Sequence, residues 1–335
     1  MGGWVKTRNL HAGLKSWLRA QNTGFGMAVG SRAWFVDGIN GSDSYAGFDD
    51  PASAKATLRA ATDACNAQDV IYVAPKGVPA DGEPGYYQDT VSDPVITSAK
   101  HGVAIVGIGH AGIIGMPYDV CVKAYTTESS TICPGLTVYA PFCAIENMGF
   151  NRGNGNVGIL FDGDSTTHQG YGGAVYNCYF RNCRGTGATG DTGGAISVVG
   201  GAQNTTIERC MFYNTRVGIA AKSGTSVTEG LTIRDCTFRA SAASGISADI
   251  YLYFQGQNYT IIDDIRIGHD VPSYSGGHAV CIVAVGGAEI GNISRVWALD
   301  TDGSVHATTG TIIRVPTTMG TSQIYNGDGS LVNAN

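Results

Sequence analysis

Apolar residues recur along this chain in a six-residue pattern whose copies begin about thirty residues apart. Positions 1, 4 and 6 of the pattern are apolar, and all copies but one carry Asn or Asp at position 3. Positions 4 and 6 share one face of a strand, whereas Asn or Asp tolerates a sharp bend. Such a repeat predicts a solenoid, in which each coil buries its apolar residues against its neighbours. The copies begin at Ile145, Val175, Ile207, Ile233, Ile262 and Ile290.

A second strand pattern follows each copy, and the longest loops fall between the two. No stretch of helical length and periodicity separates the strands, so units of strand, helix and strand are not expected. Two kinds of short strand that alternate in this way predict an all-β fold, a coil of parallel strands. The second strands are centred on Ile159, Ile196, Ile219, Ile246, Val280 and Ile312.

The two ends of the chain do not follow this repeat. A strand from Trp34, a helix over 53–66 and a buried strand over 69–74 precede Val103, where the coils begin. A helix there would cover the open end of the core. The predicted parts are an N-terminal arm (1–33), an N-terminal cap (34–100), the parallel β-helix (101–316) and a C-terminal tail (317–335).

The N-terminal cap carries a resemblance to a known family. Residues 35–37 and 41–43, Pro51, the Ala-rich helix and the strand 69–73 resemble the opening of pectate-lyase-like right-handed parallel β-helix proteins. That superfamily includes polysaccharide lyases and hydrolases, and also phage tailspikes and other virion proteins. The resemblance implies a right-handed β-helix over about 34–316, but it does not imply one activity, because the fold hosts many.

Composition narrows the class of partner. The net charge is −6, which argues against nucleic acid, and charged residues make up only 14% of the chain. No apolar run is long enough for membrane insertion, and no secretory signal is visible at the start. We therefore expect a protein that is made in the host cytoplasm. A virion protein is released when the host cell lyses, so it needs no secretory signal.

The cysteines predict packing and no chemistry. There are nine, without paired metal-ligand spacing, and Cys178, Cys210 and Cys236 occupy the same pattern position as Met148 and Ile265. We interpret them as a column of small buried side chains. No His or carboxylate keeps step with this column, so no metal is expected there. The sequence also contains no phosphate-binding loop, and no cofactor is expected.

Paired carboxylates are candidates for glycosidic chemistry. Asp162 with Asp164 and Asp300 with Asp302 have ordinary turn composition, and Asp264 beside Asp263 falls on a corner. The most distinctive group of candidate residues comes from two long loops on neighbouring coils. If these loops stack, aromatic rings, carboxylates and imidazoles could line one groove. Glycan binding, a subunit interface and catalysis remain open for this groove. Its residues are His269, Asp270, Tyr274, Trp297, Asp300, Asp302 and His306.

The N-terminal arm contains apolar residues at helical spacing, namely Leu10, Leu14, Trp17 and Leu18. It could be a further cap helix, an anchor that docks the protein on a larger assembly, or a helix that lies on a membrane surface. Together these features predict a phage virion structural protein, a surface spike or capsid or tail decoration protein. We expect a homotrimer that contacts other virion proteins through residues 1–33 and the C-terminal tail, with host surface polysaccharide as a candidate ligand. The alternative is a polysaccharide lyase or glycoside hydrolase.

Overall fold

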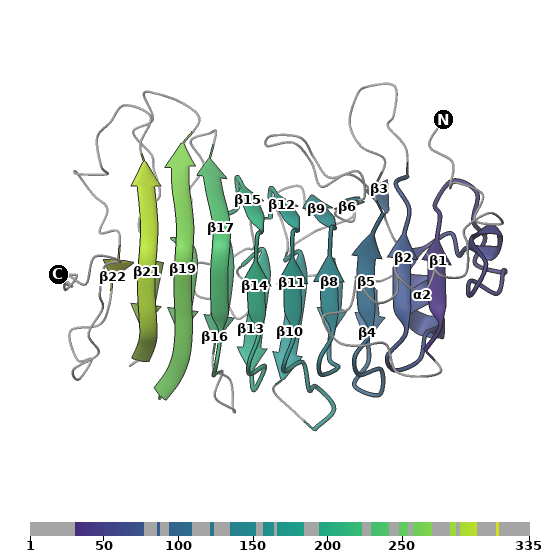
Figure 1. The fold of residues 1–335 in the computed structure, drawn as a ribbon, viewed down its shortest axis with the longest axis horizontal. Coiled ribbons are helices and arrows are strands. Elements are labelled where there is room, and N and C mark those ends of the chain that lie inside the picture. Colours follow the sequence, from purple (N-terminus) through teal and green to yellow (C-terminus); the bar gives the residue numbers. More distant parts are fainter. Residues whose placement is uncertain are drawn as a thin grey trace, which may run out of the picture.

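The chain folds into a right-handed parallel β-helix whose axis runs horizontally in Figure 1, from β1 at one end to β21 at the other. The computed structural model describes residues 31–76, 86–87, 94–108, 121–123, 135–151, 157–163, 166–183, 194–222, 229–240, 248–253, 257–269, 282–285, 289–299 and 313–314.

Two parallel sheets make up the coils. Each coil contributes two consecutive strands to the first sheet, joined by a corner, and one strand to the second sheet. The strands before the corner are β1 (Ala33–Val36), β2 (Val70–Val73), β5 (Ala104–Gly107), β8 (Ala144–Glu146), β11 (Ala174–Tyr176) and β14 (Thr206–Glu208). Those after it are β3 (Tyr86–Tyr87), β6 (Cys121–Lys123), β9 (Gly149–Asn151), β12 (Tyr179–Arg181) and β15 (Met211–Tyr213).

Towards the C-terminus the two strands of a coil merge. Continuous strands then pass through the corner: β17 (Thr232–Ala240), β19 (Gln257–His269) and β21 (Glu289–Leu299). The second sheet lies behind the first in Figure 1, with its strands running in the opposite direction. It consists of β4 (Val95–Ile96), β7 (Leu136–Val138), β10 (Ile159–Gly163), β13 (Ile196–Gly200), β16 (Val217–Lys222), β18 (Ala248–Tyr253), β20 (Ile282–Val285) and β22 (Ile313–Arg314).

The core consists of columns of like residues that run along the axis. Position 6 of the pattern forms a stack of parallel rings whose centroids lie 5.1, 5.1 and 4.6 Å apart. Each stacked pair stabilises the fold by about 0.5–1.5 kcal/mol, in addition to the stabilisation that comes from burying its surface area. The predicted columns are confirmed, including the thiol column, whose members are fully buried or nearly so. The rings belong to Phe150, Phe180, Phe212 and Phe238.

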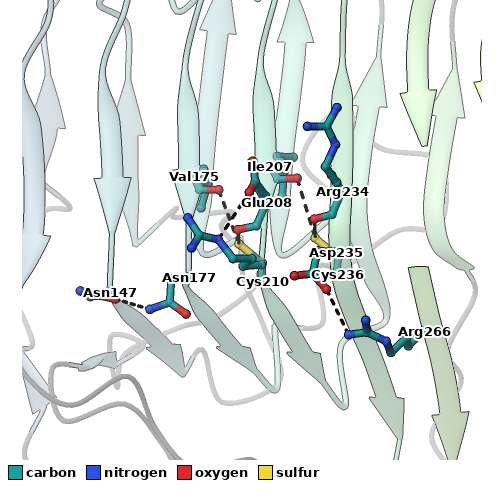
Figure 2. A network of polar contacts seen from close by, with 11 residues as sticks. Asn147, Val175, Asn177, Ile207, Glu208, Cys210, Arg234, Asp235, Cys236 and Arg266 are labelled. Atoms are coloured by element: carbon teal, nitrogen blue, oxygen red, sulfur yellow. Dashed lines mark hydrogen bonds and ion pairs between the residues drawn. The ribbon is translucent and has the colours of Figure 1, made fainter. Parts of the chain in front are cut away.

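Position 3 of the pattern is the corner that the sequence predicts. Residues there have φ between 49° and 55°, the left-handed conformation that Asn and Asp tolerate best. Figure 2 shows neighbouring corners, where the Asn177 amide donates a hydrogen bond to Asn147 and Arg266 contacts Asp235 at 3.0 Å. The column consists of Asn147, Asn177, Arg209, Asp235, Asp264 and Arg295.

The last copy of the pattern is offset from the sequence prediction. Ile262 pairs with Ile293, so the sixth copy begins at Ile293 and its corner is Arg295 rather than Asn292. Ile290 instead pairs with Thr260, and a bulge separates the two registers. Because Ile290, Ile293 and Val296 are three residues apart, they fit positions 1 and 4 of the pattern in two registers, and only the pairing with β19 distinguishes these.

Three of the predicted second strands are offset as well. The column of Ile159, Ile196 and Ile219 continues through Ile250, Ile282 and Ile313. The predicted centres Ile246, Val280 and Ile312 are therefore wrong. Strands in this sheet follow loops of variable length, and a short apolar run in such a loop imitates a strand.

The N-terminal end is closed by residues 42–57 and by a helix that is shorter than predicted. Helix α2 (Leu58–Ala64) begins after Thr57, whose hydroxyl accepts a hydrogen bond from the Ala60 N–H, and a 3-10 turn η2 (Pro51–Ser53) precedes it. Lys55 is extended and exchanges backbone hydrogen bonds with the outer edge of β1. The segment thus covers a sheet edge that would otherwise be open. Parallel pairing already begins at β1, before the residues where the sequence places the first coil.

A search of the described residues for a helix with the length and apolar character of a membrane span finds none.

Candidate functional site

The predicted groove lies mostly outside the described residues. His269 is the last residue of β19 and Trp297 lies near the end of β21, and these strands pair in parallel up to Gly268 and Leu299. The two residues therefore lie near the ends of neighbouring paired strands. Asp270, Tyr274, Asp300, Asp302 and His306 lie outside the described residues, as do Leu10, Leu14, Trp17 and Leu18. The groove and the anchor stay predictions.

Asp263 and Asp264 do not act as a pair. Asp264 occupies the left-handed corner and contacts Arg266 at 3.4 Å, whereas Asp263 accepts a hydrogen bond of 2.9 Å from Arg295. Their carboxylates are engaged by different arginines, which agrees with the interpretation as a corner residue and its neighbour. Within the described part of the chain, no group of three or more His, Cys, Asp or Glu could hold a metal ion.

A different cluster on the described surface brings aromatic side chains together with a carboxylate and an imidazole. We name it the aromatic corner: Tyr139, Phe142, Asp162, His168 and Tyr171. It lies where the chain leaves the second sheet: Tyr139 and Phe142 follow β7, Asp162 lies near the end of β10, and His168 and Tyr171 lie between β10 and β11. The predicted groove belongs to the other long-loop corner, which leads into the second sheet.

The first half of the aromatic corner is a ring stack with a carboxylate. The rings of Tyr139 and His168 are parallel, with centroids 3.8 Å apart and an interplanar angle of 5°. His168 Nδ1 lies 2.9 Å from the Asp162 carboxylate. A carboxylate only accepts hydrogen bonds, so Nδ1 carries the proton and donates it. Burial, and then the nearby Asp162 charge, raise the pKa of Tyr139, so its phenol stays a donor at neutral pH.

The second half is an edge-to-face pair. The rings of Phe142 and Tyr171 meet at 89° with centroids 5.3 Å apart. Phe142 leaves 49% of its surface exposed, which places a large apolar face in solvent. The Phe142 N–H donates to the Tyr171 carbonyl at 2.8 Å, so the backbone joins the two coils as well.

Backbone hydrogen bonds fix the loop that carries His168 and Tyr171. The Gln169 N–H donates to the Tyr139 carbonyl at 2.7 Å, and the Gly170 N–H donates to the Asp162 carbonyl at 2.8 Å. A Cβ at Gly170 would lie 2.7 Å from the Val138 carbonyl oxygen, so only Gly allows this approach. The four rings are therefore held by the scaffold.

Phe142 is a conformational outlier in its own column. The residue two places before β2, β5, β8, β11, β14 and β17 has positive φ, and in the first five of these its N–H donates to the next coil. Glycine or a polar residue fills the other steps, whereas Phe142 adopts φ of 60° with a bulky side chain. A strained residue with an exposed ring indicates a functional site. The column consists of Gln68, Gly102, Phe142, Gly172, Asn204 and Gly230.

The aromatic corner is suited to saccharide recognition. Aromatic faces pack on the apolar faces of sugar rings, while a carboxylate and a phenol bond hydroxyl groups. Sequence reasoning missed the site, although it named Asp162, because corner residues do not follow the strand period. The sequence did contain one signal. Two four-residue segments in successive corners, Tyr139 to Phe142 and His168 to Tyr171, each begin and end with a residue that has a ring.

Comparison with known proteins identifies the fold alone. No protein-family model matches the sequence, and no curated protein matches it. The crystal structure of Escherichia coli YbhC is similar, with a TM-score of 0.53 and 12% sequence identity over 99% of this chain and 89% of that chain. An identity this low carries no activity from one protein to the other. What the comparison establishes is the parallel β-helix fold.

Proposed function

We propose that the chain is a structural protein of a phage virion surface that binds a saccharide through its aromatic corner. The observation that carries the saccharide part is the exposed ring of Phe142 on a left-handed backbone. Core packing does not require this ring, because its column is otherwise filled by glycine and polar residues. A ring that is kept there despite the backbone cost serves a contact at the surface.

The scaffold suits a rigid spike. The stacked coils hold the aromatic corner on hydrogen-bonded backbone, so little conformational freedom is lost when a ligand binds. The low fraction of charged residues, and the resemblance of the N-terminal cap to a superfamily that includes phage tailspikes, motivate the virion part of the proposal, which rests on the sequence.

Ligand-detected NMR with host surface polysaccharide fragments tests the saccharide part. Tyr139→Ala and Phe142→Leu should each weaken binding at least about tenfold, because each removes a ring face worth about 1.4 kcal/mol or more. Arg295→Ala is the control, because Arg295 lies at the other corner of a different coil, on β21. This variant should bind as the wild type does. Equal binding by all variants would reject the aromatic corner as the ligand site.

Two measurements test the virion part. Light scattering coupled to size exclusion should report a homotrimer in reducing buffer, and antibodies raised against the folded chain should label intact particles in electron micrographs. A monomer in solution that fails to label particles would remove the virion role while leaving saccharide binding intact.

A polysaccharide lyase or glycoside hydrolase is the second candidate. Asp162 accepts from His168 Nδ1, and a histidine oriented in this way can act as a general base at Nε2. The wild type would then shorten a polysaccharide that it binds, while His168→Gln would bind it without shortening it. Chain length after prolonged incubation, measured by gel filtration, separates an enzyme from a binding protein.

A further inference from the structure

The first coils carry a second apolar cluster that is separate from the core. Its members are Ala33 on β1, Val70 and Tyr72 on β2, and Ala104 and Val106 on β5. The residues between them, Trp34, Ile71 and Ile105, belong to the main core. Successive side chains of a strand point to opposite faces, so the second cluster lies on the outer face of the sheet. We name it the outer patch.

The outer patch is buried although it lies outside the coils. Tyr72 exposes 9% of its surface, and Val70 and Val106 expose 1% and 4%. Every residue of β2 and β5 is buried, whereas β8 and β14 alternate with only their inner residue buried. Strands that are buried on both faces have a layer packed on each. A further layer therefore covers the outer face of the first coils.

The two outer rows of the patch differ along the axis: the row of Ala104 continues through Ala144, which packs against the patch, and the buried Ala174, whereas the row of Tyr72 becomes polar. One outer row runs from Phe35 through Tyr72 and Val106 to Glu146 and Tyr176. The row is apolar up to Val106 and changes to a carboxylate at Glu146, and Tyr176 on the next coil is half-buried. Phe35 stacks on Tyr72 with centroids 5.8 Å apart. The apolar part of the row of Tyr72 is thus about three strands wide, roughly 10 Å between β1 and β5, which matches the width of one helix.

We propose that the N-terminal arm covers the outer patch, with Leu10, Leu14, Trp17 and Leu18 packed on it. These residues follow the spacing of one helix face, and nine residues of helix span about 13 Å, close to the length of a four-residue strand. The arm enters the fold beside the patch, because the Arg32 N–H is held by the Asp69 carboxylate at 2.7 Å and β1 begins at Ala33.

Reach and charge agree with this arrangement. The fourteen residues between Leu18 and Ala33 span up to about 45 Å when extended, enough for the chain to turn back over the sheet. Basic residues flank the apolar stripe of the arm, at positions 6, 8, 15 and 19, and the patch is bordered by the acidic Glu146. The arm then acts as a lateral layer of its own β-helix, which favours the cap over the anchor.

Photo-cross-linking of the full chain tests the proposal. With Tyr72 replaced by p-benzoylphenylalanine, irradiation should join β2 to a tryptic peptide from residues 9–19, within one chain. The same replacement at Tyr176, on the same outer row beyond the patch, is the matched control and should not capture that peptide. Capture of a different segment by Tyr72, or of a second copy as a product of doubled mass, would overturn the proposal.

A second variant distinguishes a specific contact from general proximity. Leu14→Glu with Leu18→Glu should reduce the Tyr72 cross-link to the arm at least about tenfold while Lys15 and Arg19 keep their charge. It should also speed amide exchange in β2 and β5 but leave exchange in β14 unchanged. An unaltered cross-link in this variant would show that the apolar stripe does not make the contact.

Discussion

Phe142 and Gly172 occupy successive steps of one left-handed column, and Gly172 leaves the space that the Phe142 ring occupies. Their φ angles are 60° and 65°. A Cβ at Gly172 would lie 2.6 Å from Cδ1 of Phe142, so the ring rests where a side chain on the next coil would stand. Glycine at this step leaves the space and accepts the conformation, while Phe142 bears the strain.

Phe142→Asn should stabilise the fold and weaken saccharide binding. Asn tolerates left-handed backbone and occupies the same column at Asn204, so relief of strain should add about 1 kcal/mol to the free energy of unfolding. Loss of the edge-to-face contact with Tyr171 offsets part of this gain. Urea denaturation and ligand-detected NMR on the same samples measure both effects.

Phe142→Leu is the control that separates the gain in stability from the loss of binding. It removes the ring but keeps a bulky side chain on the strained backbone, so it should lose binding with no gain in stability. A Phe142→Asn protein that is destabilised by 1 kcal/mol or more would contradict the assignment of strain to this residue.

Gly172→Ala should lower stability by about 1–2 kcal/mol and also weaken binding. The added methyl meets left-handed backbone and displaces the Phe142 ring from Tyr171. Gly230→Ala is matched in conformation, with φ of 70°, but its Cβ would meet the side chain of Asn204, outside the aromatic corner. It should lower stability to a similar degree and leave binding unchanged. Equal loss of binding in both variants would show a global effect instead of a local one.

The strand columns could be predicted from the sequence because alternation along a strand is a local property. Phe150, Phe180, Phe212 and Phe238 are each the sixth residue of a recognisable pattern, and the structure stacks them. The prediction failed at Ile290 because Ile290, Ile293 and Val296 are three residues apart and satisfy positions 1 and 4 of the pattern in two registers. Only pairing with the neighbouring coil, Ile262 with Ile293, selects the later register, and a local pattern does not contain that information.

The aromatic corner could not be predicted in the same way. Gly and Asn are the residues that usually indicate left-handed backbone in a sequence, so Phe gave no reason to expect it at position 142. The contact of Tyr139 with His168 depends on two corners that fold back against each other, which no local pattern encodes. The outer patch was partly visible: the run from Val70 to Val73 is continuously apolar, and a strand of that kind is buried on both faces.

Arg209→Asn should stabilise the β-helix. Arg209 has φ of 54° in the corner column, where its neighbours Asn177 and Asp235 are residues that tolerate this conformation. The substitution should add about 0.5–1 kcal/mol, and it places an amide beside Asn177, which already donates to Asn147. Thermal and urea denaturation measure the change. Asp235→Asn, which exchanges one tolerant residue for another, should have no comparable effect.

The buried thiols should make the fold sensitive to alkaline pH. Burial raises the pKa of Cys65 to about 11 and that of Cys143 to about 12, and it raises the pKa values of Cys210 and Cys236 as well. An unfolded cysteine titrates near pH 8.5. Below that pH both states keep their protons and the stability is complete. Between about pH 8.5 and 11 the unfolded chain releases protons that the folded chain retains, so stability should fall as pH rises.

Urea denaturation in reducing buffer between pH 7 and pH 10 measures this slope. Each buried thiol contributes up to about 1.4 kcal/mol per pH unit above the unfolded pKa. Cys143→Ala should lower the stability at pH 7, because it leaves a cavity, but it should make the alkaline slope shallower by one thiol. The slope isolates titration from packing, since the cavity does not depend on pH. A Cys143→Ala protein with the wild-type slope would mean that this thiol does not keep its proton in the folded state.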